Sequence, residues 1–185
     1  DKKKTERVDL EYLETEEINP LTENIDKLDV LSILKIINME DRKVAEAISN
    51  VIDKITQIVD HCIEAIRKGG RVIYAGAGTS GRMGFIDAVE VVPTFGVPEG
   101  LFVPLIAGGE EALKRSIEAV EDDAELGRED ARKLSVDSKD VVIGIAASGR
   151  TPYVAGVLNY ARECGARTFL ICNVSKPALA EYSDV

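Results

Sequence analysis

The stretch RVIYAGAGTSGR, residues 71–82, decides the predicted fold of this chain. Residues 71–75 are an apolar run of strand length, and the glycine-rich segment GAGTSG at 76–81 follows it. A helical pattern then begins at Arg82. A strand, a glycine-rich loop and a helix in this order are typical of the ligand-binding edge of an α/β domain.

Three more apolar runs follow along the chain, at residues 101–107, 140–146 and 167–172. Helical patterns separate them, at about residues 110–122 and from Pro152 to Gly165. Strands that are apolar on both faces and alternate with helices predict a parallel sheet covered on both sides. The predicted fold class is therefore α/β, a doubly wound parallel sheet in a three-layer, flavodoxin-like sandwich.

The predicted domain covers residues 71–185, and two further segments precede it in the 185-residue chain. Residues 1–28 are polar and are expected to form an N-terminal arm. Residues 29–70 are expected to be helical and to pack on the sheet or on a dimer partner. Their apolar spacing predicts a short helix ending near Asn38 and a long one from about Asp41 to a left-handed cap at residues 69–70. A fifth strand is expected to begin at residues 182–185, which repeat the lead-in of the third.

Composition argues against several classes of partner. The chain has 23 basic and 33 acidic residues and a net charge of −10, which disfavours nucleic acid and anionic membrane surfaces. No apolar run approaches the ~20 residues that cross a bilayer. The lysines at 2–4 are followed by acids, so no signal peptide is expected. Cys62, Cys164 and Cys172 are odd in number and scattered, which predicts buried thiols in a reducing cytoplasm rather than a disulfide framework.

A second glycine-containing loop, SGRT at 148–151, follows the third predicted strand and precedes a helix opened by Pro152. In a parallel sheet both loops lie at the carboxyl edge, where helix N-termini bind anions. Backbone N–H groups, hydroxyls and the positive helix end hold a phosphate without lysines, which suits a chain of negative charge. The candidate monophosphate-binding residues are Gly78, Thr79, Ser80, Gly81, Ser148, Gly149 and Thr151.

Other uses of these residues were weighed against this interpretation. The first loop also matches the dinucleotide pattern G-x-G-x-x-G, but Thr79 and Ser80 put hydroxyls where a pyrophosphate needs close approach. His61 is the only histidine, so no metal site is expected. Arg82 and Arg150 follow the loop glycines, and three roles stay open for them: phosphate ligand, partner of an acid, or helix-flanking residue.

The segments GAGTSGR and ASGRTPYV together resemble the SIS (sugar isomerase) phosphosugar-binding fold. More narrowly, the chain resembles the N-acetylmuramic acid 6-phosphate etherases and the related glucokinase regulatory proteins. NPLTENID, IINMEDRKV, PTFGVP and IAGGEEAL also fit, so the resemblance runs from about residue 19 to the end. Residues 91–92 (VV) depart from it, because the etherases usually have Cys-Pro there. The resemblance also implies that the C-terminal part of the family fold is absent from this sequence.

The resemblance implies a lyase of cell-wall sugar recycling that cleaves the D-lactyl ether of N-acetylmuramic acid 6-phosphate. The products would be N-acetylglucosamine 6-phosphate and D-lactate, formed by C2 proton abstraction, elimination and water addition. This chemistry needs an acid and a base and no cofactor. By motif position, Glu90 is the acid and Glu121 the base. A cytoplasmic homodimer with a site near the subunit interface is also implied.

The two glutamates differ in their sequence surroundings. Glu90 lies among apolar residues of a predicted helix, an environment that raises a carboxyl pKa and suits a proton donor. Glu121 lies in an acidic run typical of a solvated face. Glu90 would stand about 12 Å along the helix beyond Arg82. We therefore hypothesise that Glu90, Glu121 or both act across a dimer interface.

Two alternatives to the etherase remain open at this point. A phosphosugar aldose–ketose isomerase would share the fold, the phosphate loops and C2 proton abstraction. A non-catalytic regulator of the glucokinase regulatory type would bind the sugar phosphate without changing it.

Overall fold

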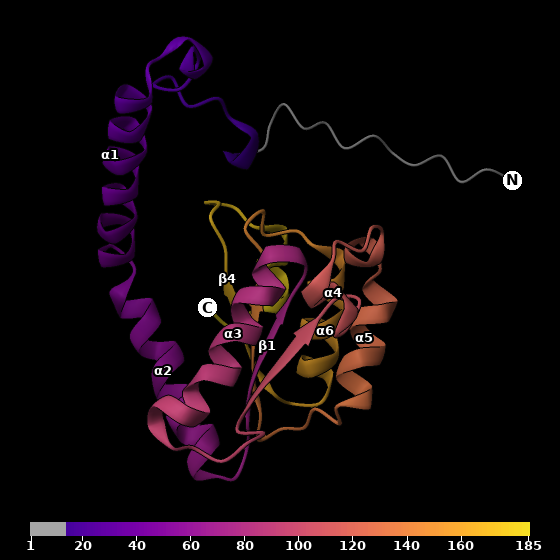
Figure 1. The fold of residues 1–185 in the computed structure, drawn as a ribbon. Coiled ribbons are helices and arrows are strands. Elements are labelled where there is room, and N and C mark those ends of the chain that lie inside the picture. Colours follow the sequence, from indigo (N-terminus) through magenta and orange to yellow (C-terminus); the bar gives the residue numbers. More distant parts are fainter. Residues whose placement is uncertain (1–13) are drawn as a thin grey trace, which may run out of the picture. The chain divides into compact units, whose positions relative to one another are not determined.

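The computed structural model describes residues 14–185, so the signal-peptide reading of residues 2–4 and the first half of the expected arm lie outside the described residues. The chain divides into two compact units, Asp1–Asp53 and Lys54–Val185. The first holds helix α1 (Val30–Ser49) and the short 3₁₀ turns η2 (Glu14–Glu16) and η3 (Ile25–Lys27). The second begins within helix α2 (Ile52–Arg67) and contains the sheet (Figure 1).

The break between the first two helices lies further along the chain than the apolar spacing predicts. Helix α1 runs through residues 38–41 without interruption, because this segment consists of helix-compatible residues and lacks glycine and proline. Helix α1 ends instead at Ser49. The next residue, Asn50, caps it: its N–H donates to the carbonyls of Glu46 and Ala47 in a tightened last turn. The predicted end of α2 is confirmed, since Gly69 has φ +77°.

The sheet has four parallel strands: β1 (Val72–Gly76), β2 (Phe102–Ile106), β3 (Val141–Ile145) and β4 (Arg167–Ile171). Their order is β2-β1-β3-β4, which confirms the predicted doubly wound parallel sheet. From β1 the chain moves outward to β2 and then returns to place β3 on the other side of β1. Ligands of doubly wound folds bind at this switch point, next to the carboxyl ends of β1 and β3.

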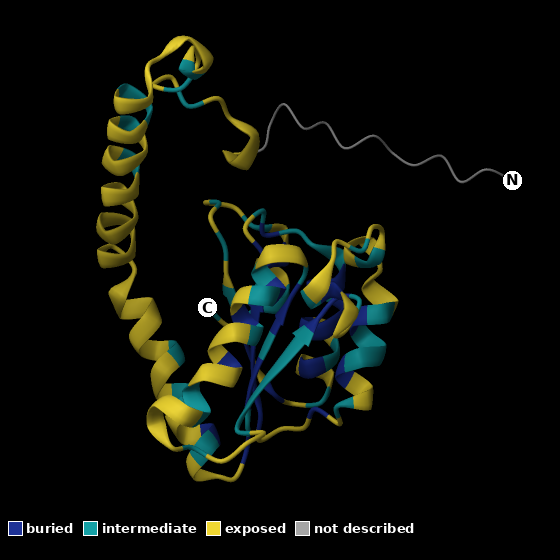
Figure 2. Ribbon diagram, viewed as in Figure 1, coloured by how far each residue is buried: buried dark blue, intermediate teal, exposed yellow. Residues whose placement is uncertain are grey.

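Helices cover both faces of the sheet, as Figure 2 shows by the dark strands between them. On one face Ala65 of α2 packs with Phe169 and Val141. Helix α3 (Gly78–Phe95) lies on the same face, where a Cβ on Gly84 would come within 2.8 Å of the Tyr74 Cβ. On the other face helix α6 (Pro152–Glu163) buries Val154, Val157 and Leu158 completely. Burial of these apolar side chains on both faces is the main stabilising contribution to the fold.

The segment after β2 differs from its prediction. The expected helix at residues 110–122 is wrong: helix α4 (Glu111–Lys114) ends early, and a 3₁₀ turn, η4 (Val120–Asp122), follows an irregular stretch. Helix α5 (Ala124–Lys133) was not predicted, because its sequence has a single large apolar residue, Leu126. Asp123 caps α5 by accepting a hydrogen bond from the Leu126 N–H at 2.9 Å. α5 packs on α6, where a Cβ on Gly156 would lie only 1.8 Å from the Ala124 carbonyl oxygen.

The last residues lie beside β4. The Asp184 N–H donates to the Thr168 carbonyl at 2.7 Å, and the Leu170 N–H donates to the Val185 carbonyl at 3.0 Å. The sequence predicts the start of a fifth strand at residues 182–185, but in the structure they form no strand: Tyr182 ends the 3₁₀ turn η5 (Ala178–Tyr182), and residues 183–185 are irregular.

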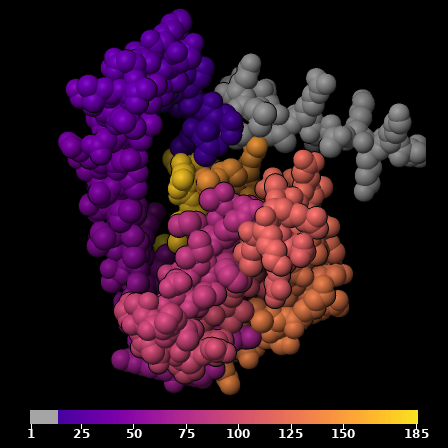
Figure 3. Space-filling view, viewed as in Figure 1, coloured from indigo at the N-terminus to yellow at the C-terminus, as the bar shows by residue number. Residues whose placement is uncertain are grey.

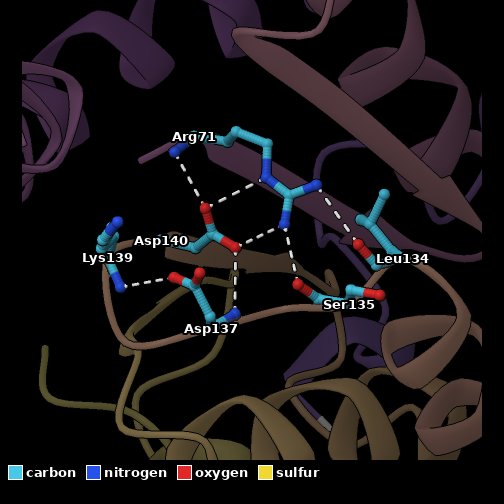
Figure 4. A network of polar contacts seen from close by, with 6 residues as sticks. All are labelled: Arg71, Leu134, Ser135, Asp137, Lys139 and Asp140. Atoms are coloured by element: carbon cyan, nitrogen blue, oxygen red, sulfur yellow. Dashed lines mark hydrogen bonds and ion pairs between the residues drawn. The ribbon is translucent and has the colours of Figure 1, made fainter. Parts of the chain in front are cut away.

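A buried ion pair joins the starts of β1 and β3 (Figure 4). The Asp140 carboxylate, only 2% exposed, accepts hydrogen bonds from Arg71 N (2.9 Å), Nε (3.1 Å) and Nη2 (2.6 Å) and from Asp137 N (3.1 Å). The Arg71 guanidinium also donates to the carbonyls of Leu134 and Ser135. Burial alone would raise the pKa of Asp140, but these hydrogen bonds and the Arg71 charge outweigh burial and lower it.

We expect Asp140→Asn to lower the free energy of unfolding by about 3 kcal/mol at neutral pH, because it leaves the Arg71 charge without its partner. The folded-state pKa of Asp140 lies below its unfolded-state value. The stabilisation is therefore complete above the unfolded pKa of about 3.9 and is lost as the pH falls through the folded value. Urea unfolding of both proteins across this pH range measures the difference.

Glu163→Gln is the matched control, because Glu163 is a more exposed carboxylate paired with an arginine, Arg128. Its cost should stay below about 1 kcal/mol. An Asp140→Asn cost no larger than this control would contradict the prediction.

Candidate functional site

The two glycine-containing loops leave adjacent strands at the same level. The first follows Gly76 at the end of β1 and the second follows Ile145 at the end of β3, and these two residues are register partners. The first loop leads into α3 at Gly78, and the second leads into α6 at Pro152. Two helix N-termini therefore lie at the β1/β3 switch point, the position predicted for the ligand.

The first loop is shorter than predicted, because α3 begins at Gly78 rather than at Arg82. Ala77 is extended and serves as the N-cap residue, so Thr79 and Ser80 belong to the first helical turn. The N–H groups of a first turn have no partner within the helix and carry the positive end of its dipole. Thr79 is exposed and Ser80 is half-buried, and both hydroxyls belong to this first turn.

Two glycines let the helix start directly against the strand. A Cβ on Gly81 would lie 2.7 Å from the Gly76 carbonyl oxygen and 2.7 Å from Cγ1 of Ile106. A Cβ on Gly76 would lie 2.7 Å from the Gly81 nitrogen. No other residue type fits at either position without a shift of the backbone.

The second loop is held by the segment that follows β4. Gly149 has φ +64°, and a Cβ there would lie 2.4 Å from the Cβ of Pro177. Its carbonyl accepts a hydrogen bond from the Leu179 N–H at 2.9 Å. Ser148 and Thr151 are half-buried, and the Thr151 side chain makes no capping hydrogen bond although Thr151 is the N-cap residue of α6. Both hydroxyls therefore lie at the N-terminus of α6.

A cavity of about 190 Å³ opens beside the N-terminus of α3. Gly78 and Arg82 line it from α3, and Glu121 lines it from η4. The other lining residues are Ala77, Ala107, Ala112, Ser116, Ile117, Glu118, Ala119 and Val120. The structure therefore brings Glu121 to the first loop. The cavity is smaller than the roughly 300–1,000 Å³ of typical ligand sites, so it encloses only part of a sugar phosphate.

Comparison with known proteins gives the family of this fold and site. The sequence matches the family described as the glucokinase regulatory protein N-terminal SIS domain over residues 54–162. The chain belongs to this SIS-domain family. This confirms the resemblance that the loop motifs predict.

Solved structures share the fold of this SIS domain. A phosphoheptose isomerase from Neisseria gonorrhoeae is 15% identical with a TM-score of 0.64, and the match covers 82% of this chain and 79% of that one. A phosphoheptose isomerase from Francisella tularensis is 19% identical with a TM-score of 0.56, covering 82% and 81%. At these identities the likeness concerns the fold alone.

Curated relatives are much more similar in sequence. The N-acetylmuramic acid 6-phosphate etherase of Pseudothermotoga lettingae is 57% identical over 176 residues, which are 95% of this chain and 59% of the relative. The etherase of Petrotoga mobilis is 54% identical over the same shares of the two chains. The chain thus spans about three fifths of the length of these relatives.

Glu90 does not line the cavity of the SIS domain. It lies on α3 about twelve residues beyond Gly78, or about 18 Å along the axis at 1.5 Å per residue. Within residues 14–185 the apolar environment expected around Glu90 is not present, because Glu90 itself is exposed and the neighbouring Ile86 is 56% exposed. The structure therefore separates the two candidate carboxylates of one chain.

Arg82 contacts the segment after β2. Its Nε donates to the Ala112 carbonyl at 2.9 Å, and its Nη2 donates to the Arg115 carbonyl at 3.2 Å. Figure 3 shows α3 and this segment as adjoining magenta and salmon surfaces. The lining residues 116–120 were not predicted as site residues, because they fall within the helix expected at residues 110–122. The N-cap Asp123 is the signal that indicates a new helix start there.

The remaining candidate groups are the histidine and the three cysteines. His61 packs against the Phe169 ring at 5.4 Å between centroids. Cys62, Cys164 and Cys172 are free thiols, so the prediction of no disulfide framework is confirmed, but all three are half-buried rather than buried. Burial raises the pKa of Cys62 to about 11. In the described part of the chain, none of the helices has the length and apolar character required to cross a membrane.

Replacement of Gly81 by alanine tests the close contact between β1 and α3. We expect Gly81→Ala to lower the free energy of unfolding by about 1–3 kcal/mol, because the new Cβ overlaps Gly76 and Ile106. Ser80→Ala adds no atoms and should change stability by less than about 0.5 kcal/mol. Urea unfolding compares the two variants, and equal stabilities would show that the contact tolerates a side chain.

Proposed function

We propose that this SIS domain is the phosphosugar-binding and catalytic part of an N-acetylmuramic acid 6-phosphate etherase. The observation that carries the proposal is the cavity in which Glu121 and the first loop meet, in a chain 57% identical to a curated etherase. The proposed substrate carries a phosphate, a C2 proton and a lactyl ether on C3. Each of these needs a group that the domain supplies.

The phosphate is proposed to bind at the two helix N-termini. Gly78, Thr79 and Ser80 supply first-turn N–H groups and two hydroxyls, and the loop of Ser148, Gly149 and Thr151 adds the second helix end. Gly81 was also a candidate, but its N–H donates to the Ala77 carbonyl at 3.2 Å, so its role is to let the turn lie close to β1. Hydrogen bonds from N–H groups to an ionised oxygen are stronger than those between neutral groups. The site therefore binds a dianion although the chain has a net charge of −10.

Glu121 is proposed as the base and Glu90 as the acid. In the open-chain sugar, the C2 proton lies next to the aldehyde, so a carboxylate can remove it. The protonated Glu90 gives its proton to the ether oxygen as the C3–O bond breaks and lactate leaves. Water then adds across the C2=C3 double bond, with its hydroxyl on C3 and a proton on C2. The product is N-acetylglucosamine 6-phosphate.

The acid is proposed to come from a second copy of the chain. Glu90 shares an exposed stripe of α3 with Met83 and Ile86, which are 60% and 56% exposed. Spacings of three and four residues place these three side chains on one helix face. An apolar stripe around a carboxylate favours a subunit contact, which would shield the Glu90 carboxyl group from water. The proposed protein is thus a homodimer with shared sites, working in the cytoplasm.

The first test is D-lactate release from N-acetylmuramic acid 6-phosphate by the native protein that carries this chain. Glu121→Gln and Glu90→Gln should each lower kcat by about 10²–10⁴, because each removes a proton-transfer group. Glu125→Gln is the control, since Glu125 is a nearby exposed acid that does not line the cavity.

Three results would contradict the etherase. No lactate from the unmutated protein would do so directly. Binding of the sugar phosphate without any conversion would favour a regulator. Conversion of an aldose phosphate to a ketose phosphate without lactate release would favour an isomerase.

A second test mixes two kinds of inactive subunit. One carries Glu90→Gln, and the other carries Ser80→Ala and Ser148→Ala, which remove phosphate-binding hydroxyls. If Glu90 acts on a phosphate held by the partner, one of the two sites of a mixed dimer regains both groups. Up to about half of wild-type activity per mixed dimer should return, since a C2 dimer has two equivalent sites. Activity no higher than the sum of the separate variants would place both groups in one subunit.

A further inference from the structure

The segment after β2 leaves the helical path where it contacts α3. In a continuous helix, the Ala112 carbonyl would accept a hydrogen bond from the N–H of Ser116, four residues later. α4 ends at Lys114, and the Arg82 Nε donates to that carbonyl instead, at 2.9 Å. The Arg82 Nη2 donates to the Arg115 carbonyl at 3.2 Å. Arg82 therefore caps the C-terminus of a helix that is not its own.

The path that follows is strained. Ala119 has φ +65°, a left-handed conformation that residues with a Cβ rarely adopt. The segment packs against Gly108, where a Cβ would lie 3.1 Å from Cδ1 of Ile117 and 3.5 Å from Cγ2 of Val120. Contacts outside the segment must hold a conformation of this kind, because local preferences oppose it. Arg82 and Gly108 supply such contacts.

We propose that Arg82 is a positioning residue that holds residues 115–121 off the helical path and so keeps Glu121 at the cavity. This role rests on the proposed function of Glu121 as the base. Arg82 follows Gly81 directly, so the first turns of α3 both form the phosphate site and anchor the segment that carries the base. A phosphate ligand is the role usually expected of an arginine at this place. The observed geometry instead directs two of its nitrogens at carbonyl oxygens.

The test compares Arg82→Gln with the double variant Arg82→Gln/Ala119→Gly. Glycine adopts positive φ freely and disfavours a continuous helix, so Ala119→Gly stabilises the non-helical path in both ways. Arg115→Gln is the matched control, because the Arg115 side chain is exposed and pairs with Glu111 of α4. Two measurements are made on each protein: hydrogen exchange of residues 111–123, and kcat and KM for lactate release.

Arg82→Gln should accelerate exchange of residues 111–123 and lower kcat about tenfold or more, since a small displacement of a catalytic group is costly. KM should change by less than about threefold, because the phosphate loop keeps its structure. The double variant should recover part of kcat and of the protection, and Arg115→Gln should match the wild type. Rescue by a residue that has no contact with phosphate separates positioning from binding.

Unchanged exchange in Arg82→Gln together with a raised KM would overturn the inference and make Arg82 a substrate ligand. Failure of Ala119→Gly to restore any protection would also overturn it. If the wild type releases no lactate, the proposed function fails. The exchange data then still report whether Arg82 holds the segment.

Discussion

The contact between Gly76 and Gly81 is the constraint on which the site depends. With no side chain on either residue, the first turn of α3 lies directly on the end of β1. That contact points the N–H groups of the turn past the sheet edge and sends Arg82 toward the segment after β2. It also sets the direction of α3, which carries Glu90 away from the cavity. The proposed phosphate site, the segment of the proposed base and the position of the proposed acid thus follow from one junction.

The same junction explains how an acidic chain can hold a phosphate. Fixed N–H dipoles act at short range and lose little to solvent when they are preorganised, whereas the net charge of −10 acts over longer distances and is screened by salt. The local field of two helix ends at the β1/β3 switch point therefore determines the sign of the electrostatic potential at the proposed phosphate site. The buried Arg71–Asp140 pair at the opposite edge keeps these two strands in register without placing a cation near the ligand.

The parts predictable from sequence were those set by local patterns. Apolar runs and glycine spacing identified the four strands, both loops and the fold, because strand burial and helix starts depend on neighbouring residues. The path of residues 115–121 was not predictable, since its cause is Arg82, a residue more than thirty positions away that caps α4. The exposed position of Glu90 was also missed. The sequence pattern of an apolar helix face is the same whether the face packs on its own domain or on a second chain.

In the proposed dimer, both the buried and the exposed face of α3 have a role. Its buried face, marked by Gly81, Gly84 and Ala88, commits the helix to its own sheet. In the proposed dimer its N-terminus would bind the phosphate in its own subunit, and its exposed stripe with Glu90 would face the other subunit. In a two-fold symmetric dimer each α3 would then act twice, once at each end. Gly78 and Glu90 are about 18 Å apart along α3, which is too far for one sugar phosphate to contact both in the same chain. In the proposed dimer these two residues of one helix belong to two different sites.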